Sequence, residues 1–211
     1  MCKTLLISLL LVASTLSGAT IVSPISGVVN TSGPGFGSLA DTLNQNGLLT
    51  NFVSGVTNFD TYIATNPLHS LVFFGNEWFS NQGATTAMVT YDLGSTRRID
   101  RLALWNEDAS GIGLLNLFYS TDNITFMSLV SNIMPTDHAA VNYAADVISF
   151  GGAVDARYVR FDMSNCPQPN GGSFVACAIG EVAFSEVPEP SSMVMFGLGL
   201  AALVGARFRR S

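Results

Sequence analysis

Short apolar and alternating segments, separated by turn residues, fill the chain from residue 88 onward. Branched and aromatic side chains are frequent in them, and glycine, serine, asparagine and aspartate stand between them, which is typical of strands joined by tight turns. In one segment the alternation places Val159 and Phe161 on the inner face of a sheet and Arg160 and Asp162 on the outer face. We predict strands at 88–93, 99–105, 114–119, 125–129, 146–150, 156–162 and 174–184.

Helical periodicity is nearly absent between residues 20 and 186. The one candidate helix, 39–45, is short, and Gly47 stands where a C-terminal cap is expected. Six or more short strands without helices between them favour an antiparallel sandwich. We therefore predict an all-β fold with an antiparallel β-sandwich as its body.

The N-terminus has the pattern of a secretory signal peptide. Lys3 precedes an apolar run at residues 5–12, and the small residues Ser17, Gly18 and Ala19 follow it. The alternative is a buried N-terminal helix. We expect cleavage after Ala19, so that residues 1–19 leave and the mature chain begins at Thr20.

The C-terminus combines an uncharged apolar stretch, 191–206, with a basic cluster formed by Arg207, Arg209 and Arg210. Sixteen helical residues span about 24 Å, which is short of a hydrocarbon core of about 30 Å. The arginines would stay on the cytoplasmic side, which leaves the body on the far side of the membrane. We predict a single membrane-spanning helix that holds the bilayer only marginally.

Four residues ahead of this stretch carry a resemblance. Val187, Pro188, Glu189 and Pro190, followed by the apolar stretch and the arginines, resemble the PEP-CTERM sorting signal. The resemblance implies an exosortase as partner, transient anchoring in the inner membrane, and a destination at the cell surface or in the polysaccharide matrix of a Gram-negative bacterium. A plain membrane anchor, the alternative, would have a longer span and would not explain Pro-Glu-Pro. We divide the chain into a signal peptide (1–19), a body (20–186) and a sorting signal (187–211).

Charge narrows the range of partners. Residues 20–186 contain five basic and 14 acidic residues, a net charge of −9. Nucleic acids and anionic lipid surfaces are bound by clustered lysine and arginine. We therefore expect no nucleic-acid partner, and contact with a membrane only through the C-terminal helix.

The sequence shows no catalytic pattern. His69 and His138 are the only histidines, neither stands in a metal-ligand spacing, and there is no Gly-x-Ser-x-Gly motif. The acidic pair Glu107–Asp108 and the pair Asp137–His138 are typical of solvated loops. We predict that the protein is not an enzyme.

Two cysteines remain after removal of the signal peptide, which contains Cys2. Cys166 and Cys177 would lie in an oxidising compartment, where an even pair favours a disulfide. Such a bridge would close a 12-residue loop, worth about 2 to 3 kcal/mol. Two buried free thiols are the alternative.

The strands themselves resemble, in order, the discoidin or coagulation-factor type C group of galactose-binding-like jelly rolls. The segments that carry this resemblance are 89–94, 99–106, 117–126, 156–161 and 179–184. It implies an antiparallel jelly-roll sandwich and one structural Ca²⁺ between an N-terminal loop and a glutamate of the last strand. Glu181 matches that glutamate, with Asp60 and Thr61 as further oxygen ligands. The alternative is that Glu181 faces solvent.

Modules of this group bind sugars through exposed aromatic side chains, which implies Phe59, Tyr62, Trp78 and Phe79 as ligand-binding candidates. Trp105 ends an apolar strand and is expected in the core. The sequence predicts an exported, non-catalytic envelope or matrix protein whose sandwich binds carbohydrate or another matrix component. The alternative is a structural or adhesive surface protein without a small ligand.

Overall fold

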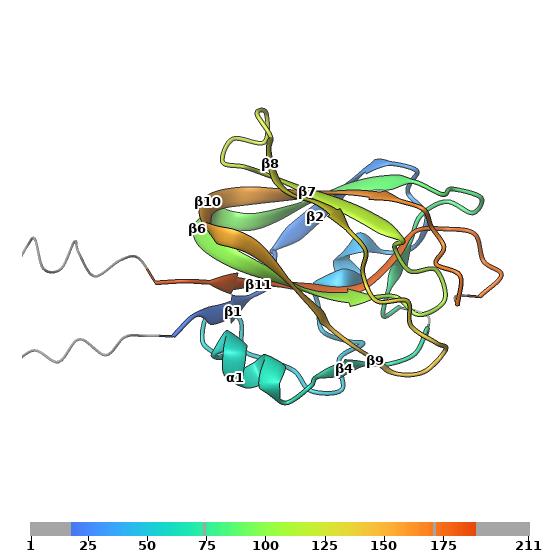
Figure 1. Ribbon diagram of the computed structural model, residues 1–211, viewed down its shortest axis with the longest axis horizontal. Coiled ribbons are helices and arrows are strands. Elements are labelled where there is room, and N and C mark those ends of the chain that lie inside the picture. The colour runs from blue at the N-terminus through green and yellow to red at the C-terminus, as the bar shows by residue number, and fades with distance from the viewer. Residues whose placement is uncertain (1–17, 74, 171, 189–211) are drawn as a thin grey trace, which may run out of the picture.

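Two long bent strands, β6 (Ala87–Asn106) and β10 (Asp146–Ser164), organise the fold of this computed structural model, which describes residues 18–73, 75–170 and 172–188 (Figure 1). Because both strands bend, each strand has one half in one layer of an antiparallel β-sandwich and its other half in the other layer. The first half of β6 pairs with β2 and its second half with β11. Likewise, the last residues of β10 pair with β7.

One layer contains β11, the second half of β6 and the first half of β10. The other contains, side by side, β2, the first half of β6, the second half of β10, β7 and β8. The sheet order is β3-β5-β11-β6-β10-β7-β8, with β1 paired to β11 and β2 to β6, and β4 pairs separately with β9. The remaining strands are β1 (Thr20–Val22), β2 (Ser26–Thr31), β3 (Phe36–Gly37), β4 (Leu68–His69), β5 (Trp78–Phe79), β7 (Leu114–Ser120), β8 (Met127–Ile133), β9 (Tyr143–Ala144) and β11 (Ala178–Glu186). The predicted all-β, antiparallel sandwich is thereby confirmed.

Turn residues inside β6 and β10 mark bends rather than strand ends, which corrects two boundaries. The predicted strands 88–93 and 99–105 are halves of β6, and 146–150 and 156–162 are halves of β10. Gly94 and Gly151 have φ values of +83° and +75°, so each lets the chain turn a corner while the strand continues. The strand predicted at 125–129 begins at residue 127, and the one predicted at 174–184 begins at residue 178.

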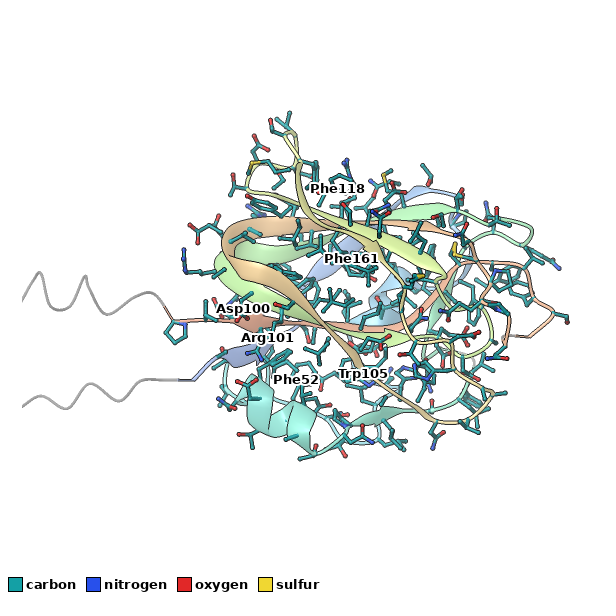
Figure 2. The ribbon with its side chains drawn as sticks, viewed as in Figure 1. Phe52, Asp100, Arg101, Trp105, Phe118 and Phe161 are labelled. Atoms are coloured by element: carbon teal, nitrogen blue, oxygen red, sulfur yellow. A yellow bond between two sulfur atoms is a disulfide. The ribbon has the colours of Figure 1, made fainter. Side chains whose placement is uncertain are left out.

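The main core lies between the two layers. Val159 and Phe161 of β10 are fully buried there, as the alternation predicts, together with Leu104 of β6 and Phe184 of β11. Figure 2 shows Phe161 between the layers and Phe118 on the outside of the β7–β10 layer. Burial of such side chains contributes about 1.5 to 3 kcal/mol each.

A second apolar cluster lies under the other face of the β11 layer. It contains Trp105, Phe52, Phe59 and Tyr62, and it is covered by the short helix α1 (Phe59–Ala64). Both faces of β11 are therefore covered, and all its residues but the last are buried. This double burial explains why β11 reads as a continuous apolar run rather than an alternating one.

The helices differ from the sequence prediction. The candidate 39–45 forms only a 3₁₀ turn, η1 (Leu39–Thr42), capped by Ser38. The unpredicted helix α1 begins after Asn58, whose side chain accepts a hydrogen bond from the Thr61 N–H at 2.9 Å. Phenylalanine, threonine, tyrosine and isoleucine make up most of its six residues, and these types have low helix propensity.

The two ends of the described chain lie side by side (Figure 1), because β1 pairs with β11. Within residues 18–73, 75–170 and 172–188, no helix has the length and apolar character needed to span a membrane. Most of the predicted signal peptide (1–17), the membrane helix, and Glu189, Pro190, Arg207, Arg209 and Arg210 lie outside the described residues.

Candidate ligand-binding site

A pocket lined by phenylalanine side chains opens at the end of the sandwich opposite the two ends of the described chain (Figure 1). Its volume is about 370 Å³, within the range of small-ligand sites. Phe73 is 69% exposed and Phe36 is 48% exposed, so the pocket presents a contiguous apolar patch to solvent, the kind of surface that is a candidate for ligand binding. The lining residues are Phe36, Gly37, Val72, Phe73, Gly75, Glu77, Phe79, Ala109 and Phe174.

Three of the rings form one contiguous aromatic wall. Phe36 lies directly opposite Phe79 in the β3–β5 pair, so both side chains leave the same face. Phe174 meets Phe36 and Phe79 edge to face, with ring centroids 5.4 and 5.8 Å away. Gly37 has a φ of +70°, and a Cβ there would collide with the Glu77 backbone, so glycine allows β3 to approach this closely.

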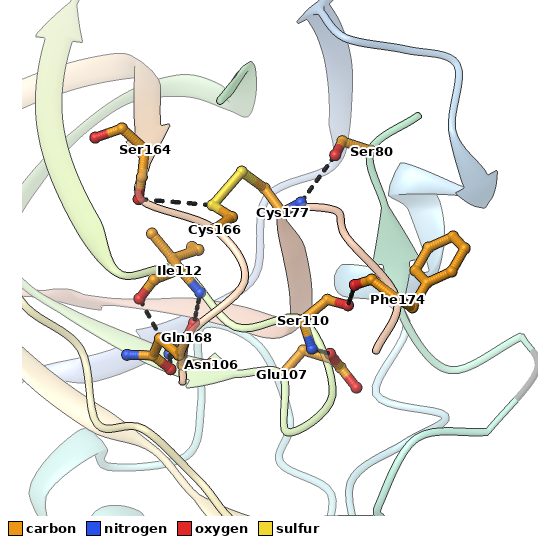
Figure 3. Close-up of a disulfide and its surroundings, with 10 residues drawn as sticks. All are labelled: Ser80, Asn106, Glu107, Ser110, Ile112, Ser164, Cys166, Gln168, Phe174 and Cys177. Carbon is orange, nitrogen blue, oxygen red and sulfur yellow. Dashed lines mark hydrogen bonds between the residues drawn. A yellow bond between two sulfur atoms is a disulfide. The ribbon is translucent and has the colours of Figure 1, made fainter. Parts of the chain in front are cut away.

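The loop that carries Phe174 is fixed at several points (Figure 3). The disulfide between Cys166 and Cys177 ties the chain after β10 to the start of β11. The Ser110 hydroxyl donates to the Phe174 carbonyl at 2.6 Å, and the Cys177 N–H donates to the Ser80 Oγ at 2.8 Å. The loop that carries Phe174 is therefore fixed by one covalent bond and by hydrogen bonds on either side of the ring.

Three buried acidic side chains accept hydrogen bonds from the backbone of the loops that line the pocket. Glu77 accepts the Phe73 N–H, and Asp108 accepts the Val72 N–H at 2.9 Å. Glu107 accepts the Ala109 N–H at 2.9 Å as well as that of Ser110. Each of these bonds fixes backbone beside a lining residue.

Burial disturbs the protonation of this cluster. Desolvation raises the pKa of Glu77 and of Glu107 from 4.5 to about 8, because the charged form loses its water. Desolvation likewise raises the pKa of Asp108 and lowers the pKa of His69. The expectation that Glu107–Asp108 is a solvated pair is thus wrong: both are 1% exposed, since the backbone of neighbouring loops folds over them.

The family comparison decides which group this arrangement belongs to. Residues 58–178, more than half of the chain, match the family model described as the F5/8 type C domain. The chain belongs to the F5/8 type C family. The resemblance to the discoidin or coagulation-factor type C group is confirmed by this match. Residues 186–210 match the PEP-CTERM protein-sorting motif, which confirms the second resemblance and implies processing by an exosortase and export to the cell surface.

Solved structures similar to this F5/8 type C protein include carbohydrate-binding modules. One is chitosan-binding module 1 of a chitosanase/glucanase from Paenibacillus sp. IK-5, with a TM-score of 0.48, 17% identity, and coverage of 77% of this chain and 95% of that chain. Another is the CBM32 of AlyQ in complex with 4,5-unsaturated mannuronic acid, with a TM-score of 0.45, 16% identity, and coverage of 78% and 96%. None of the curated proteins matches the chain. The family assignment therefore rests on the F5/8 type C match.

The aromatic residues named from the resemblance lie in two different places. Phe59 and Trp78 are fully buried and Tyr62 is 5% exposed, which corrects the expectation that they are exposed. Only Phe79 reaches the pocket. Trp105 is in the core as expected, and its indole N–H donates to the Pro67 carbonyl at 2.9 Å.

The calcium candidates of the F5/8 type C domain are not brought together. The Asp60 carboxylate on α1 pairs with the guanidinium of Arg101. Glu181 is fully buried, its Oε2 accepts the Gln45 N–H at 2.9 Å, and its Oε1 has no partner. Asp60 and Thr61 are exposed on α1, and Arg101, which holds Asp60, lies opposite Ser185, four positions along β11 from Glu181, or about 13 Å along the strand. The three predicted ligands therefore do not fit one calcium site, and the alternative of a solvent-facing Glu181 is wrong.

Metal-binding side chains are sparse elsewhere too. In the part of the chain that the structure describes, no group of three or more histidine, cysteine, aspartate or glutamate side chains could hold a metal ion. Any cation at Glu181 would need backbone carbonyls or amide oxygens as its other ligands.

Sequence reasoning missed three of the four pocket rings: Phe36, Phe73 and Phe174. Each lies outside the predicted strands or at a strand end, close to glycine in the sequence. An aromatic residue in a glycine-rich loop is not expected to fill the core, so its place in such a loop was the sequence signal that could have pointed to a binding surface.

Proposed function

We propose that this protein is an exported carbohydrate-binding protein that holds a glycan in the phenylalanine pocket of its F5/8 type C domain. The observation that carries the proposal is a solvent-open pocket whose walls are four phenylalanine rings. The C–H faces of a sugar ring pack on aromatic faces, and an apolar pocket of this size is the usual form of a small-ligand site.

The chemistry of the pocket restricts the ligand. Glu77 is the only ionisable residue among the lining residues, and its carboxyl group is largely turned to the Phe73 backbone. Hydrogen bonds to the ligand would therefore come mainly from loop backbone. We expect a sugar with an extended apolar face, held more by stacking than by charge.

The proposal includes the division of the chain into a signal peptide (1–19), a body (20–186) and a sorting signal (187–211). Strand β1 begins at Thr20 and β11 ends at Glu186, which supports both boundaries. The outer segments would be a signal peptide and a removable sorting signal, with a transient helix in the inner membrane. The mature protein would reach the cell surface or the extracellular matrix.

The position of the pocket supports this layout. Strand β11 begins four residues after Phe174 and ends at Glu186, directly before Val187. Nine strand residues extend roughly 25 to 30 Å. The pocket thus lies at the end of the domain opposite the sorting signal and would face away from the membrane while the chain is anchored.

We also propose a structural Ca²⁺, with Glu181 rather than Asp60 as its carboxylate ligand. The unpartnered Oε1 of Glu181 is buried, and a buried oxygen without a partner costs about 1 to 3 kcal/mol. A cation there would both satisfy this oxygen and keep the carboxyl group ionised.

A glycan panel tests the binding proposal. The purified protein is applied to neutral oligosaccharides of glucose, galactose, mannose and N-acetylglucosamine, and we expect saturable binding to at least one. Absence of binding at millimolar sugar would favour the structural or adhesive protein without a small ligand.

A further inference from the structure

Arg160 occupies the centre of the outer face of the sandwich, away from the phenylalanine pocket. It lies on β10 between the buried residues Val159 and Phe161, so its side chain leaves the opposite face. Its partners across the sheet are Thr90 on β6 and Phe118 on β7. The residue therefore stands in the middle of a broad sheet surface rather than at an edge or in a loop.

The guanidinium of Arg160 packs against two aromatic rings. Its central carbon lies 5.0 Å from the ring centroid of Phe118 and 4.2 Å from that of Phe126. Cation–π contacts of this kind restrict the orientation of the planar group. The donors around its edge are therefore presented in a fixed plane.

Every other arginine among the described residues has an acidic partner. The pairs are Arg97–Glu186, Arg98–Asp155, Arg101–Asp60 and Arg157–Asp92. Arg160 makes no hydrogen bond or ion pair with any described residue, and its Nε is buried without a partner. In a body with a net charge of −9, a cation that is rigidly held yet unpaired is unusual.

We propose that Arg160 is a binding site for the carboxylate of an acidic polysaccharide lying along this sheet face. The planar guanidinium matches the two oxygens of a carboxylate, and it does so with little loss of side-chain entropy because the rings already hold it. This proposal rests on the proposed function for the class of ligand, but it concerns a second site.

The surroundings of Arg160 set the kind of anion it can take. Thr90 and Asn116 on the neighbouring strands are neutral, whereas Asp162 lies two residues along β10 on the same face. A membrane or a nucleic acid presents many closely spaced charges and needs many cations. One guanidinium beside one carboxylate suits a ligand that brings a single carboxylate to this face, such as one uronate residue of a polysaccharide chain.

Binding to oligogalacturonate, with its methyl ester as the uncharged ligand of the same backbone, tests the proposal. We expect the full-length protein to bind the acid more tightly than the ester, with a difference that shrinks as salt is raised. Arg160→Gln should lose this preference, weakening binding of the acid by about tenfold or more. Arg98→Gln, which removes the same charge elsewhere, should change it by less than about twofold.

Two further variants keep the test decisive if Arg160→Gln folds poorly. Arg160→Lys retains the charge but not the planar donor pair, and should bind with intermediate affinity. Asp162→Asn should tighten binding of the acid by about twofold, because it removes a like charge from the face. Equal loss in Arg160→Gln and Arg98→Gln, or no preference for the acid in the unmodified protein, would overturn the proposal.

A pocket variant separates this site from the proposed function. Phe73→Ala should impair binding of neutral glycan and leave the preference for the acid over the ester unchanged. If neutral glycans fail to bind while the acid still binds through Arg160, the pocket proposal fails and the Arg160 proposal stands.

Discussion

Thr20 lies directly opposite Glu186 in the antiparallel pair of β1 and β11. The first strand after the expected cleavage site is therefore joined, residue by residue, to the last strand before the sorting motif. The domain is closed at this end, and the phenylalanine pocket opens at the other.

Stability should depend on β1 because its residues fill the core. Ile21 is fully buried, whereas Ile25, four residues later, is 68% exposed. We predict that Ile21→Ala lowers the free energy of unfolding by about 2 to 4 kcal/mol, and that Ile25→Ala changes it by less than about 0.5 kcal/mol. Urea denaturation of both variants checks this. Equal effects would mean that β1 is not part of the stable fold.

The disulfide should support both stability and the pocket. Replacing Cys166 and Cys177 together by alanine reopens a loop that holds Phe174. We predict a loss of about 2 to 3 kcal/mol of stability and weaker glycan binding, since the aromatic wall loses one fixed end. Reductant should reproduce both effects in the unmodified protein. Unchanged stability in the double variant would show that the bridge does not constrain the chain.

Stability should fall as pH rises toward 8. The pKa of Glu77 and of Glu107 is raised from 4.5 to about 8 in the folded state, so the folded protein binds protons more tightly than the unfolded chain between these values. This contribution is complete below pH 4.5 and is lost through pH 8. Tm should decline between pH 7 and 9; below about pH 6.5 the lowered pKa of His69 acts in the opposite direction.

The control for this pH effect is Glu77→Gln, which keeps an acceptor for the Phe73 N–H but cannot ionise. Its Tm should fall less steeply with pH than that of the unmodified protein. If the two slopes are the same, Glu77 ionises in the folded protein as it does in water.

Calcium should stabilise the protein through Glu181. Millimolar CaCl₂ should raise the Tm, and EDTA should reverse the rise, because a ligand that binds only the folded state shifts unfolding. Glu181→Gln should abolish the response, whereas Asp60→Asn should retain it. If calcium still raises the Tm of Glu181→Gln, the ion binds at another site. If calcium does not change the Tm of the unmodified protein, the calcium proposal is wrong.

Much of the fold could be predicted from local patterns. The alternation around Val159 and Phe161 gave the correct inner face, because only one register buries both. Glycine in a strand was harder to interpret. Gly94 and Gly151 stand in segments whose residue types are typical of turns, yet β6 and β10 continue past them. Only pairing with a distant strand distinguishes a bend from an end.

The candidate site was less predictable for a physical reason. Phe59 and Trp78 look like surface aromatics in sequence, but segments far along the chain cover them. Phe36 and Phe174 are 138 positions apart in the numbering, and only the pairing of β3, β5 and β11 brings their rings within 5.4 Å. Contacts between segments so far apart in the sequence cannot be predicted from local composition.

The central claim is that glycan binding takes place on the phenylalanine pocket. The most direct measurement is the affinity, by titration calorimetry, of the best glycan from the panel for the unmodified protein and for Phe73→Ala/Phe174→Ala. Ile124→Ala, which removes an exposed apolar side chain outside the pocket lining, is the control. We predict a loss of at least about tenfold in the pocket variant and no change in the control. Equal affinity in all three proteins would contradict the claim.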